Sequence, residues 1–119
     1  MPSDVPHERL QDIITNIDRL RGHLRGTTPG LKLDGKTRDA VERCLERISE
    51  AAKKLGAIME ERQPRVSWRG IRGLGNVLRH EYDEVDDSTI TRIVEQELGP
   101  LREACVHELA VLRDHEGAR

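Results

Sequence analysis

Apolar residues recur at helical spacing along most of this chain. Between positions 6 and 24 they follow the i, i+3, i+4, i+7 pattern of an amphipathic helix, at Leu10, Ile13, Ile14, Ile17, Leu20 and Leu24. We therefore predict a first helix from about Pro6 to Leu24, with one apolar face directed to a core. The run GTTPGLKLDG at 26–35 is rich in turn formers and predicts a loop.

A second helix is predicted from about Lys36 to Glu61. Its apolar positions are Val41, Cys44, Leu45, Ile48, Ala52, Leu55 and Met59. Asp34 is a candidate N-cap, because its carboxylate can accept a hydrogen bond from an unpaired amide of the first turn. Pro64 then closes the connection to the next helix.

The third predicted helix runs from Trp68 to about His80, with Ser67 as a candidate N-cap. Three glycines within six residues are unusual in a helix, since each costs roughly 1 kcal/mol relative to alanine. They stand at Gly70, Gly73 and Gly75. They indicate either a loop-like start or the close approach of another backbone, as in a helix crossing between two chains.

Two more helical segments follow an acidic turn at 81–87. Asp87 or Ser88 is expected to cap the first of them, which carries Ile90, Ile93 and Val94. Gly99-Pro100 should interrupt it, because proline lacks an amide hydrogen and clashes with the preceding turn. The final helix carries Leu101, Cys105, Leu109 and Leu112, and we expect a frayed tail at 114–119.

These patterns predict an all-α protein, because no segment shows sustained strand alternation. We expect one domain, residues 1–119, folded as a four- to five-helix antiparallel bundle. Hydrophobic and charged residues each make up 35% of the chain, which suits narrow apolar stripes and leaves room for a second copy to complete the core. Cys44 and Cys105 stand on those stripes, so we interpret both as core residues.

Composition excludes several functions. With no Phe, one Tyr and one Trp, the chain cannot build a stacking platform for nucleic-acid bases, and Trp68 is best interpreted as a core anchor. A net charge of −2 means that any nucleic-acid binding must come from a local patch. The amino terminus has no hydrophobic signal core, and no apolar run approaches the roughly 18 residues of a membrane span, so we expect a cytosolic protein.

One segment stands out by charge. Between Arg62 and His80 there are five arginines and no acidic residue, and five acidic residues follow within 81–87. One interpretation is two solvated faces that pair with each other across a dimer or along the bundle. The other is an anion site beside an acidic rim.

Helical spacing favours the anion site. Arg72, Asn76 and His80 are four residues apart, which places a cation, an amide and an imidazole on one ridge, and Arg79 can reach the same region. Arginine matches phosphate oxygens with its planar fork, and histidine can accept a proton from a ribose 2′-hydroxyl. No carboxylate cluster with metal spacing lies nearby in the sequence, so this chemistry would need no metal or other cofactor. The alternative is a surface histidine on a charged helix.

The run VSWRGIRGLGNVLRHEYDEVD at 66–86 resembles the signature of HepT-like proteins. In that signature a tryptophan opens the helix, an asparagine precedes a histidine by four, and His-x-Tyr follows; the matching residues are Trp68, Asn76, His80 and Tyr82. The rest of the chain is also similar, from Arg9-Leu10-Gln11-Asp12-Ile13 in the first helix, through Ala40-Val41, Ile48 and Glu50-Ala51 in the second, to Leu98-Gly99-Pro100-Leu101.

The resemblance implies a HEPN-like helical fold that dimerises and cleaves RNA in a cleft between the two copies. It also implies a partner, a MntA-like nucleotidyltransferase antitoxin, which transfers AMP to the tyrosine of His-x-Tyr, here Tyr82, and so silences the toxin. A regular helix would place Tyr82 on a different side from His80, unless the helix ends at His80. Tyr82 can also be interpreted as a partly buried structural residue.

The chain departs from the family pattern at Gly75, where the motif arginine should stand directly before Asn76. Arg72 and Arg79 are the candidates to replace it, because an arginine side chain spans about one helical turn of 5.4 Å. Three hypotheses follow. The first is a metal-independent endoribonuclease toxin that uses His80, Arg79, Arg72 and Asn76. The second is a non-catalytic module that binds a nucleotidyltransferase partner or a nucleotide, and the third is a plain dimeric helical scaffold.

Overall fold

The computed structural model describes residues 5–28, 32–80 and 85–117, and the regular structure in this part of the chain is helical throughout. The helices are α1 (Pro6–Leu24), α2 (Gly35–Leu55), α3 (Ile58–Arg62), α4 (Trp68–His80), α5 (Asp87–Gln96) and α6 (Leu98–Gly117). The predicted all-α antiparallel bundle is therefore confirmed. None of the described helices combines the length and the apolar character that a bilayer crossing requires.

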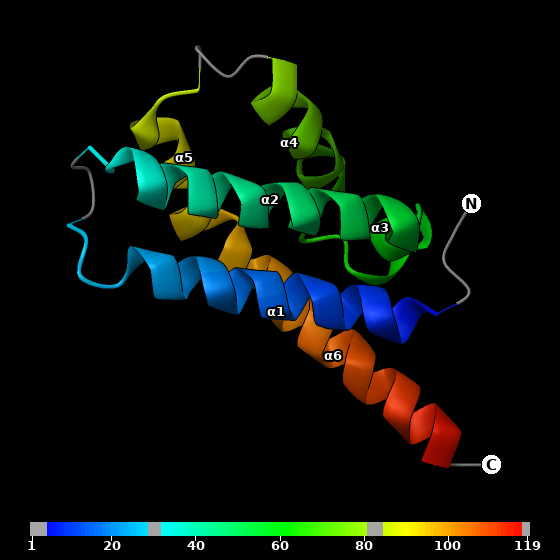
Figure 1. Cartoon of the computed structure of the whole chain (residues 1–119). Helices are drawn as coiled ribbons and strands as arrows, with labels where there is room; N and C mark the ends of the chain where they lie inside the picture. Colours follow the sequence, from blue (N-terminus) through cyan, green and yellow to red (C-terminus); the bar gives the residue numbers. More distant parts are fainter. Residues whose placement is uncertain (1–4, 29–31, 81–84, 118–119) are drawn as a thin grey trace.

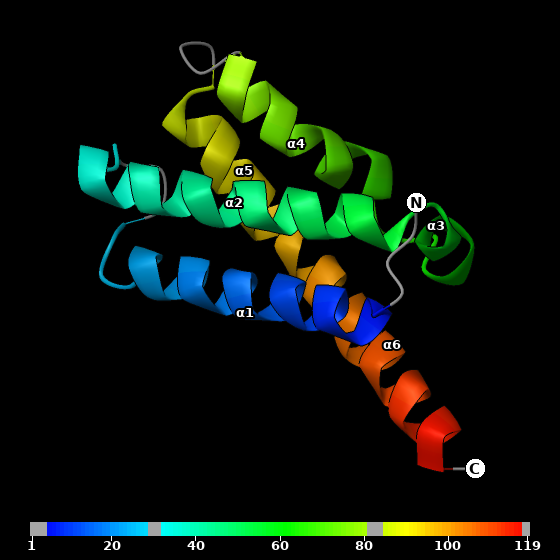
Figure 2. The ribbon, with the colours of Figure 1, turned by 45° about the vertical axis from the view of Figure 1, so that its right-hand side comes forward.

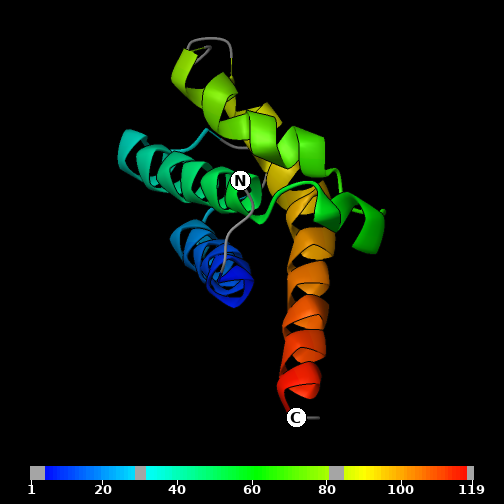
Figure 3. The ribbon, with the colours of Figure 1, turned by 90° about the vertical axis from the view of Figure 1, so that its right-hand side faces the viewer.

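The α2 helix lies at the centre of the arrangement. It runs antiparallel to α1 and packs against α4 on its other side (Figure 1). The turned view in Figure 2 again shows α2 between α1 and α4. The α6 helix packs against α1 and α5, and its C-terminal half projects beyond the α1–α2 pair (Figure 3). Because α2 lies between them, the exposed faces of α1 and α4 are on opposite sides of this helix.

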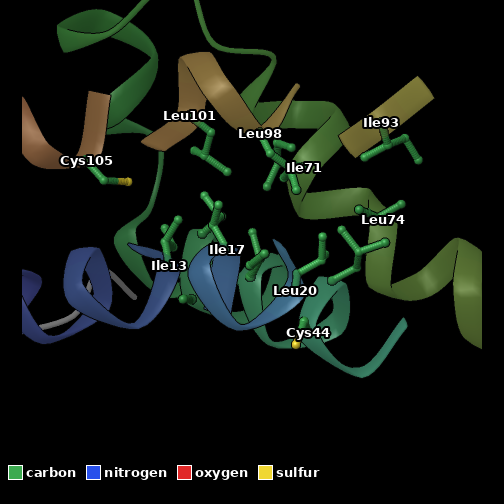
Figure 4. Packing of buried hydrophobic residues seen from close by; sticks show 14 of the residues in the cluster. Ile13, Ile17, Leu20, Cys44, Ile71, Leu74, Ile93, Leu98, Leu101 and Cys105 are labelled. Carbon is green, nitrogen blue, oxygen red and sulfur yellow. The ribbon is translucent and has the colours of Figure 1, made fainter. Parts of the chain in front are cut away.

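The core forms where the apolar stripes of these helices meet. Ile13, Ile17 and Leu20 of α1 point towards α6 and α4, where Leu98, Leu101 and Ile71 face them (Figure 4). Trp68 is buried, and its indole Nε1 donates a hydrogen bond to the Gln63 carbonyl at 3.0 Å. The interpretation of Trp68 as a core anchor is confirmed.

Both cysteines are buried and free, as predicted. Cys105 is fully buried, and this burial, with the nearby Glu108 carboxylate, raises the pKa of its thiol to about 12. Burial also raises the pKa of the Cys44 thiol. Neither thiol is therefore in its reactive thiolate form at neutral pH.

The predicted second helix was wrong in its extent, because Gly56 divides it. Gly56 has φ = +79°, a conformation that costs glycine little but strains other residues, and α2 ends just before it. The short helix α3 then turns Met59 into the core and leaves Glu60 and Glu61 exposed. This turn determines which side chains α3 presents to α4.

The predicted boundaries around α5 and α6 also need correction. The N-cap of α5 is Asp86, whose carboxylate accepts from the Thr89 amide at 2.8 Å, and it is neither Asp87 nor Ser88. The interruption falls at Glu97 instead of Gly99-Pro100. Pro100 lies in the first turn of α6, where a missing amide hydrogen costs little. The predicted fraying at 114–119 was wrong for 114–117, which continue α6.

Two buried or half-buried ion pairs connect segments that are distant in sequence. Arg38 of α2 binds Glu42 and Asp87 at 2.9 Å each, and Asp87 also accepts from the Leu33 amide at 2.7 Å. In the second pair, Glu108 of α6 accepts from Arg62 and Gln63. Burial disfavours the charged form of Glu108, but these two donors together outweigh it, so the pKa of this carboxyl is lowered. These pairs fix the two ends of the segment that carries α4.

Candidate active-site helix

The candidate residues lie on a regular helix. Because α4 is continuous from Trp68 to His80, Arg72, Asn76 and His80 follow one another at one-turn intervals along one ridge, as their spacing predicted. Asn76, Arg79 and His80 are exposed, whereas Arg72 is half-buried. The other member of the set, Tyr82, lies outside the described residues.

A single serine docks α4 onto α2. The Ser49 hydroxyl donates to the Arg72 carbonyl at 2.8 Å and accepts from the Gly75 amide at 3.1 Å. A Cβ atom at Gly75 would stand 3.2 Å from Ser49 Oγ and 3.4 Å from Ser49 Cβ. A side chain at position 75 would therefore press on Ser49, so glycine suits the close contact between α4 and α2.

This contact decides between the two interpretations of the glycines. The close approach is present at Gly75, and it is made by α2 of the same chain. Gly73 has open space around it, and a Cβ at Gly70 would meet only Ser67 at 3.9 Å. The loop-like start is not observed, because α4 is helical from Trp68.

Arg79 occupies the space beside the missing side chain. Its Nη1 atom lies 3.6 Å from the point where a Cβ on Gly75 would stand. The side chain thus folds back by one turn and delivers its guanidinium next to position 75. A cation is present there although the residue before Asn76 carries no side chain.

Arg72 is directed to a different neighbour. Its guanidinium forms an ion pair with Glu60 of α3, while Nη1 is buried with no hydrogen-bond partner in the described part of the chain. Glu60 partly neutralises its charge. Sequence reasoning missed this pair because it placed Glu60 on an uninterrupted second helix. Of the two arginines that could replace the motif residue, Arg79 has the more available charge.

The remaining charges of the segment fall into two groups. Arg62 is paired with Glu108, whereas Arg65 and Arg69 form no ion pair with any described residue.

On the acidic side, hydrogen bonds from the Thr89 amide and hydroxyl lower the pKa of Asp86. Asp87 is bound to Arg38. These two carboxylates therefore stabilise the start of α5, and neither pairs with the arginines of 62–80.

A metal centre has little to build on in the described ranges, where no three His, Cys, Asp or Glu side chains gather as a cation site requires. The chemistry that α4 offers is that of exposed cationic, amide and imidazole groups. Such a set can hold a phosphodiester and move a proton at it.

Comparison with known proteins places this arrangement in a family context. The family model described as Ribonuclease HepT-like matches residues 13–108. Two similar proteins of Methanocaldococcus jannaschii are named "Putative RNase MJ1380" and "Putative RNase MJ1216". The first is 34% identical over 65 residues, which cover 55% of this chain and 60% of that protein. The second is 31% identical over 78 residues, which cover 66% and 62%.

A third protein of the same organism, "Putative RNase MJ0125", is 33% identical over 63 residues, 53% of this chain and 54% of its own length. The chain therefore spans between half and two thirds of the length of these relatives. No solved structure matches it.

The Ser49–Gly75 contact predicts different effects of alanine at Gly73 and Gly75 on stability. Gly73→Ala should raise the free energy of unfolding by about 0.5–1 kcal/mol, because alanine is favoured in helices and the site is open. Gly75→Ala should lose this gain or destabilise the protein, because its Cβ meets a serine held by two hydrogen bonds. Urea unfolding at several protein concentrations measures both and separates them from self-association. An equal gain at both positions would show that Ser49 does not constrain α4.

Proposed function

This chain belongs to the Ribonuclease HepT-like family, and we propose that it is a metal-independent endoribonuclease, the toxin of a HepT/MntA-type toxin–antitoxin pair. The observation that carries the proposal is the position of the Arg79 guanidinium beside Gly75, on the same exposed end of α4 as His80. It supplies a cation beside position 75, where the family's arginine is missing. The names of the three relatives, each named as a "Putative RNase", agree with an RNA substrate.

In the proposed reaction, His80 takes the proton of a ribose 2′-hydroxyl, and that oxygen attacks the adjacent phosphorus. The bond from phosphorus to the 5′-oxygen breaks, which leaves a 2′,3′-cyclic phosphate, and the departing 5′-oxygen takes up a proton from water to become a hydroxyl. Arg79 stabilises the charge that builds on the phosphoryl oxygens, which is where a preorganised donor has its largest effect. Asn76 positions the phosphate or hydroxyl, and Arg72 contributes from the same ridge.

We further propose that two copies meet across α4 and form the cleft in which RNA is cleaved. The outer face of α4 supports this, because Gly70 and Gly73 add no side chain there and Val77 exposes 36% of its surface. Small residues allow two helices to approach closely, and an exposed valine gains from burial. Two His80 side chains would then face one groove.

The proposed regulation is AMP transfer to Tyr82 by a MntA-like nucleotidyltransferase antitoxin. The phenolic oxygen attacks the α-phosphorus of ATP, pyrophosphate leaves, and the phenolic proton passes to a base of the transferase. The added phosphate places negative charge two residues from His80 in the sequence, where it would repel an RNA phosphate. We expect cytosolic action, because both the RNA and the ATP are found there.

The second candidate function is a non-catalytic HEPN module that binds a nucleotidyltransferase partner or a nucleotide. The observation that favours it is Gly75 itself, because the motif arginine is missing there and a side chain at this position would press on Ser49. In this case Arg79 would bind phosphate without promoting cleavage.

Substitutions on α4 should separate these candidates. His80→Ala should reduce RNA cleavage by the purified chain at least about 100-fold, the usual contribution of a general acid–base group. Arg79→Ala should cause a loss of roughly 100-fold, as for other charge-stabilising donors. Arg72→Ala should cost less, because Glu60 already binds its guanidinium. Gel assays with a labelled RNA measure the rates.

Arg65→Ala is the matched control, since it removes an exposed arginine of the same segment and should leave cleavage unchanged. RNA cleavage that persists in the His80→Ala protein would refute the nuclease mechanism. A wild-type chain that binds RNA or a nucleotidyltransferase without cleaving RNA would instead support the non-catalytic module.

The proposed dimer predicts that Val77→Asp yields monomers and abolishes cleavage, because a buried carboxylate would face its own copy. Val111→Asp on α6 is the control, since Val111 is equally exposed at 36%. Sedimentation equilibrium gives the oligomeric state. Monomers that cleave RNA at the wild-type rate would exclude a cleft shared between two copies.

The regulatory proposal predicts that a MntA-like nucleotidyltransferase and ATP add one AMP to the chain and abolish cleavage. Intact-protein and peptide mass spectrometry locate the adduct. Tyr82→Phe should accept no AMP and stay active in the presence of the transferase. Modification of the Tyr82→Phe protein to the same extent would assign the acceptor to another residue.

A further inference from the structure

A second basic surface lies between α1 and α2, on the side of α2 that faces away from α4. It consists of two adjoining hollows of about 380 and 470 Å³, which share Arg19 and Arg47. We call the two together the α1–α2 furrow. It extends along α1 from Arg9 to His23, which corresponds to about 21 Å of helix.

The furrow is positively charged although the chain carries a net charge of −2. Five cationic side chains line it against two carboxylates, Asp12 and Glu50; the cations are Arg9, Arg19, Arg43, Arg47 and Lys54. Arg43 is paired with Glu46, whereas Arg19, Arg47 and Lys54 form no ion pair with any described residue. The charge of these three is therefore available to an anionic ligand.

A buried polar atom at the same place needs a hydrogen-bond donor. Asn16 lines the furrow, is only 7% exposed, and its Oδ1 has no partner in the described part of the chain. Its Nδ2 donates to the Asp12 carbonyl at 2.8 Å, which fixes the orientation of the amide. A buried acceptor without a hydrogen bond costs free energy. A ligand that donates a hydrogen bond to Asn16 Oδ1 would remove this cost and bind more tightly.

We propose that the α1–α2 furrow binds the sugar–phosphate backbone of RNA. Arg19 and Arg47 contact successive phosphates, and the Asn16 carbonyl accepts a hydrogen bond from a ribose 2′-hydroxyl. The inference rests on the proposed function only in taking the same RNA as its ligand. The furrow is a binding surface, separated by α2 from the residues on α4.

The chemistry of the furrow selects RNA over other anions. No Phe, Tyr or Trp lines it, and His23 stands at one end, so recognition must fall mainly on phosphate and sugar and not on stacked bases. The 2′-hydroxyl is both donor and acceptor and is what distinguishes RNA from DNA at a given site. The carboxylates of an acidic protein surface could also pair with the arginines. They are ionised at neutral pH, however, and cannot donate a hydrogen bond to Asn16 Oδ1.

Fluorescence anisotropy tests the proposal with a labelled single-stranded RNA and a DNA of the same sequence, in the His80→Ala background to prevent cleavage. Combined Arg19→Ala and Arg47→Ala should lower RNA affinity at least tenfold. The slope of log affinity against log salt should become shallower by about 0.7 for each phosphate that the variant no longer binds. Asn16→Leu should lower the affinity for RNA to that for DNA and leave the affinity for DNA unchanged. Its free energy of unfolding should not fall below that of the wild type.

Arg21→Ala and Lys53→Ala are the matched controls, because they remove the same charge from α1 and α2 outside the furrow. Unchanged RNA affinity in the Arg19 and Arg47 variant, or an equal loss in the controls, would overturn the proposal. Equal affinity of the wild-type furrow for RNA and DNA would overturn the role of Asn16. RNA binding through the furrow by a chain that never cleaves RNA would refute the nuclease and leave this inference intact.

Discussion

The candidate site depends on how closely α4 approaches α2. That approach is set by Ser49, whose hydroxyl binds backbone atoms of Arg72 and Gly75 on two successive turns of α4. Because Gly75 has no side chain, the helix settles directly on the serine. The rotation of α4 is thereby fixed, with Trp68, Ile71 and Leu78 directed to the core and Asn76, Arg79 and His80 directed to solvent.

The same contact explains why the cation beside position 75 belongs to a neighbouring residue. Residue 75 faces α2, so an arginine there would have to displace Ser49. Arg79 stands one turn later on the helix and reaches back over the glycine. Arg72 stands nearly one turn earlier, but the break at Gly56 brings Glu60 against it. Two arginines that appear equivalent in the sequence are thus left with different amounts of available charge.

The central position of α2 divides the charged surface into two parts. One is the exposed end of α4, and the other is the furrow between α2 and α1. Neither follows from the overall charge, which is slightly negative. The ion pairs of Arg38 with Asp87 and of Arg62 with Glu108 instead use their charges to join distant segments. Charges with similar spacing in the sequence are therefore either used in ion pairs that join distant segments or left exposed on these two surfaces.

The sequence alone determined the helices and the core, because apolar periodicity reports directly which face of a helix is buried. The bounds of α1 and α4, the burial of Trp68 and both cysteines, and the ridge of Arg72, Asn76 and His80 all followed from it. Only the tertiary structure decided the break between α2 and α3 at Gly56, the capping of α5 by Asp86, the partners of each arginine and the unpaired side-chain Oδ1 of Asn16. The ion pairs of Arg38, Arg62 and Arg72 join residues far apart in the chain, and the cap and the helix break depend on backbone conformation. Neither is encoded by a pattern of hydrophobic and polar residues.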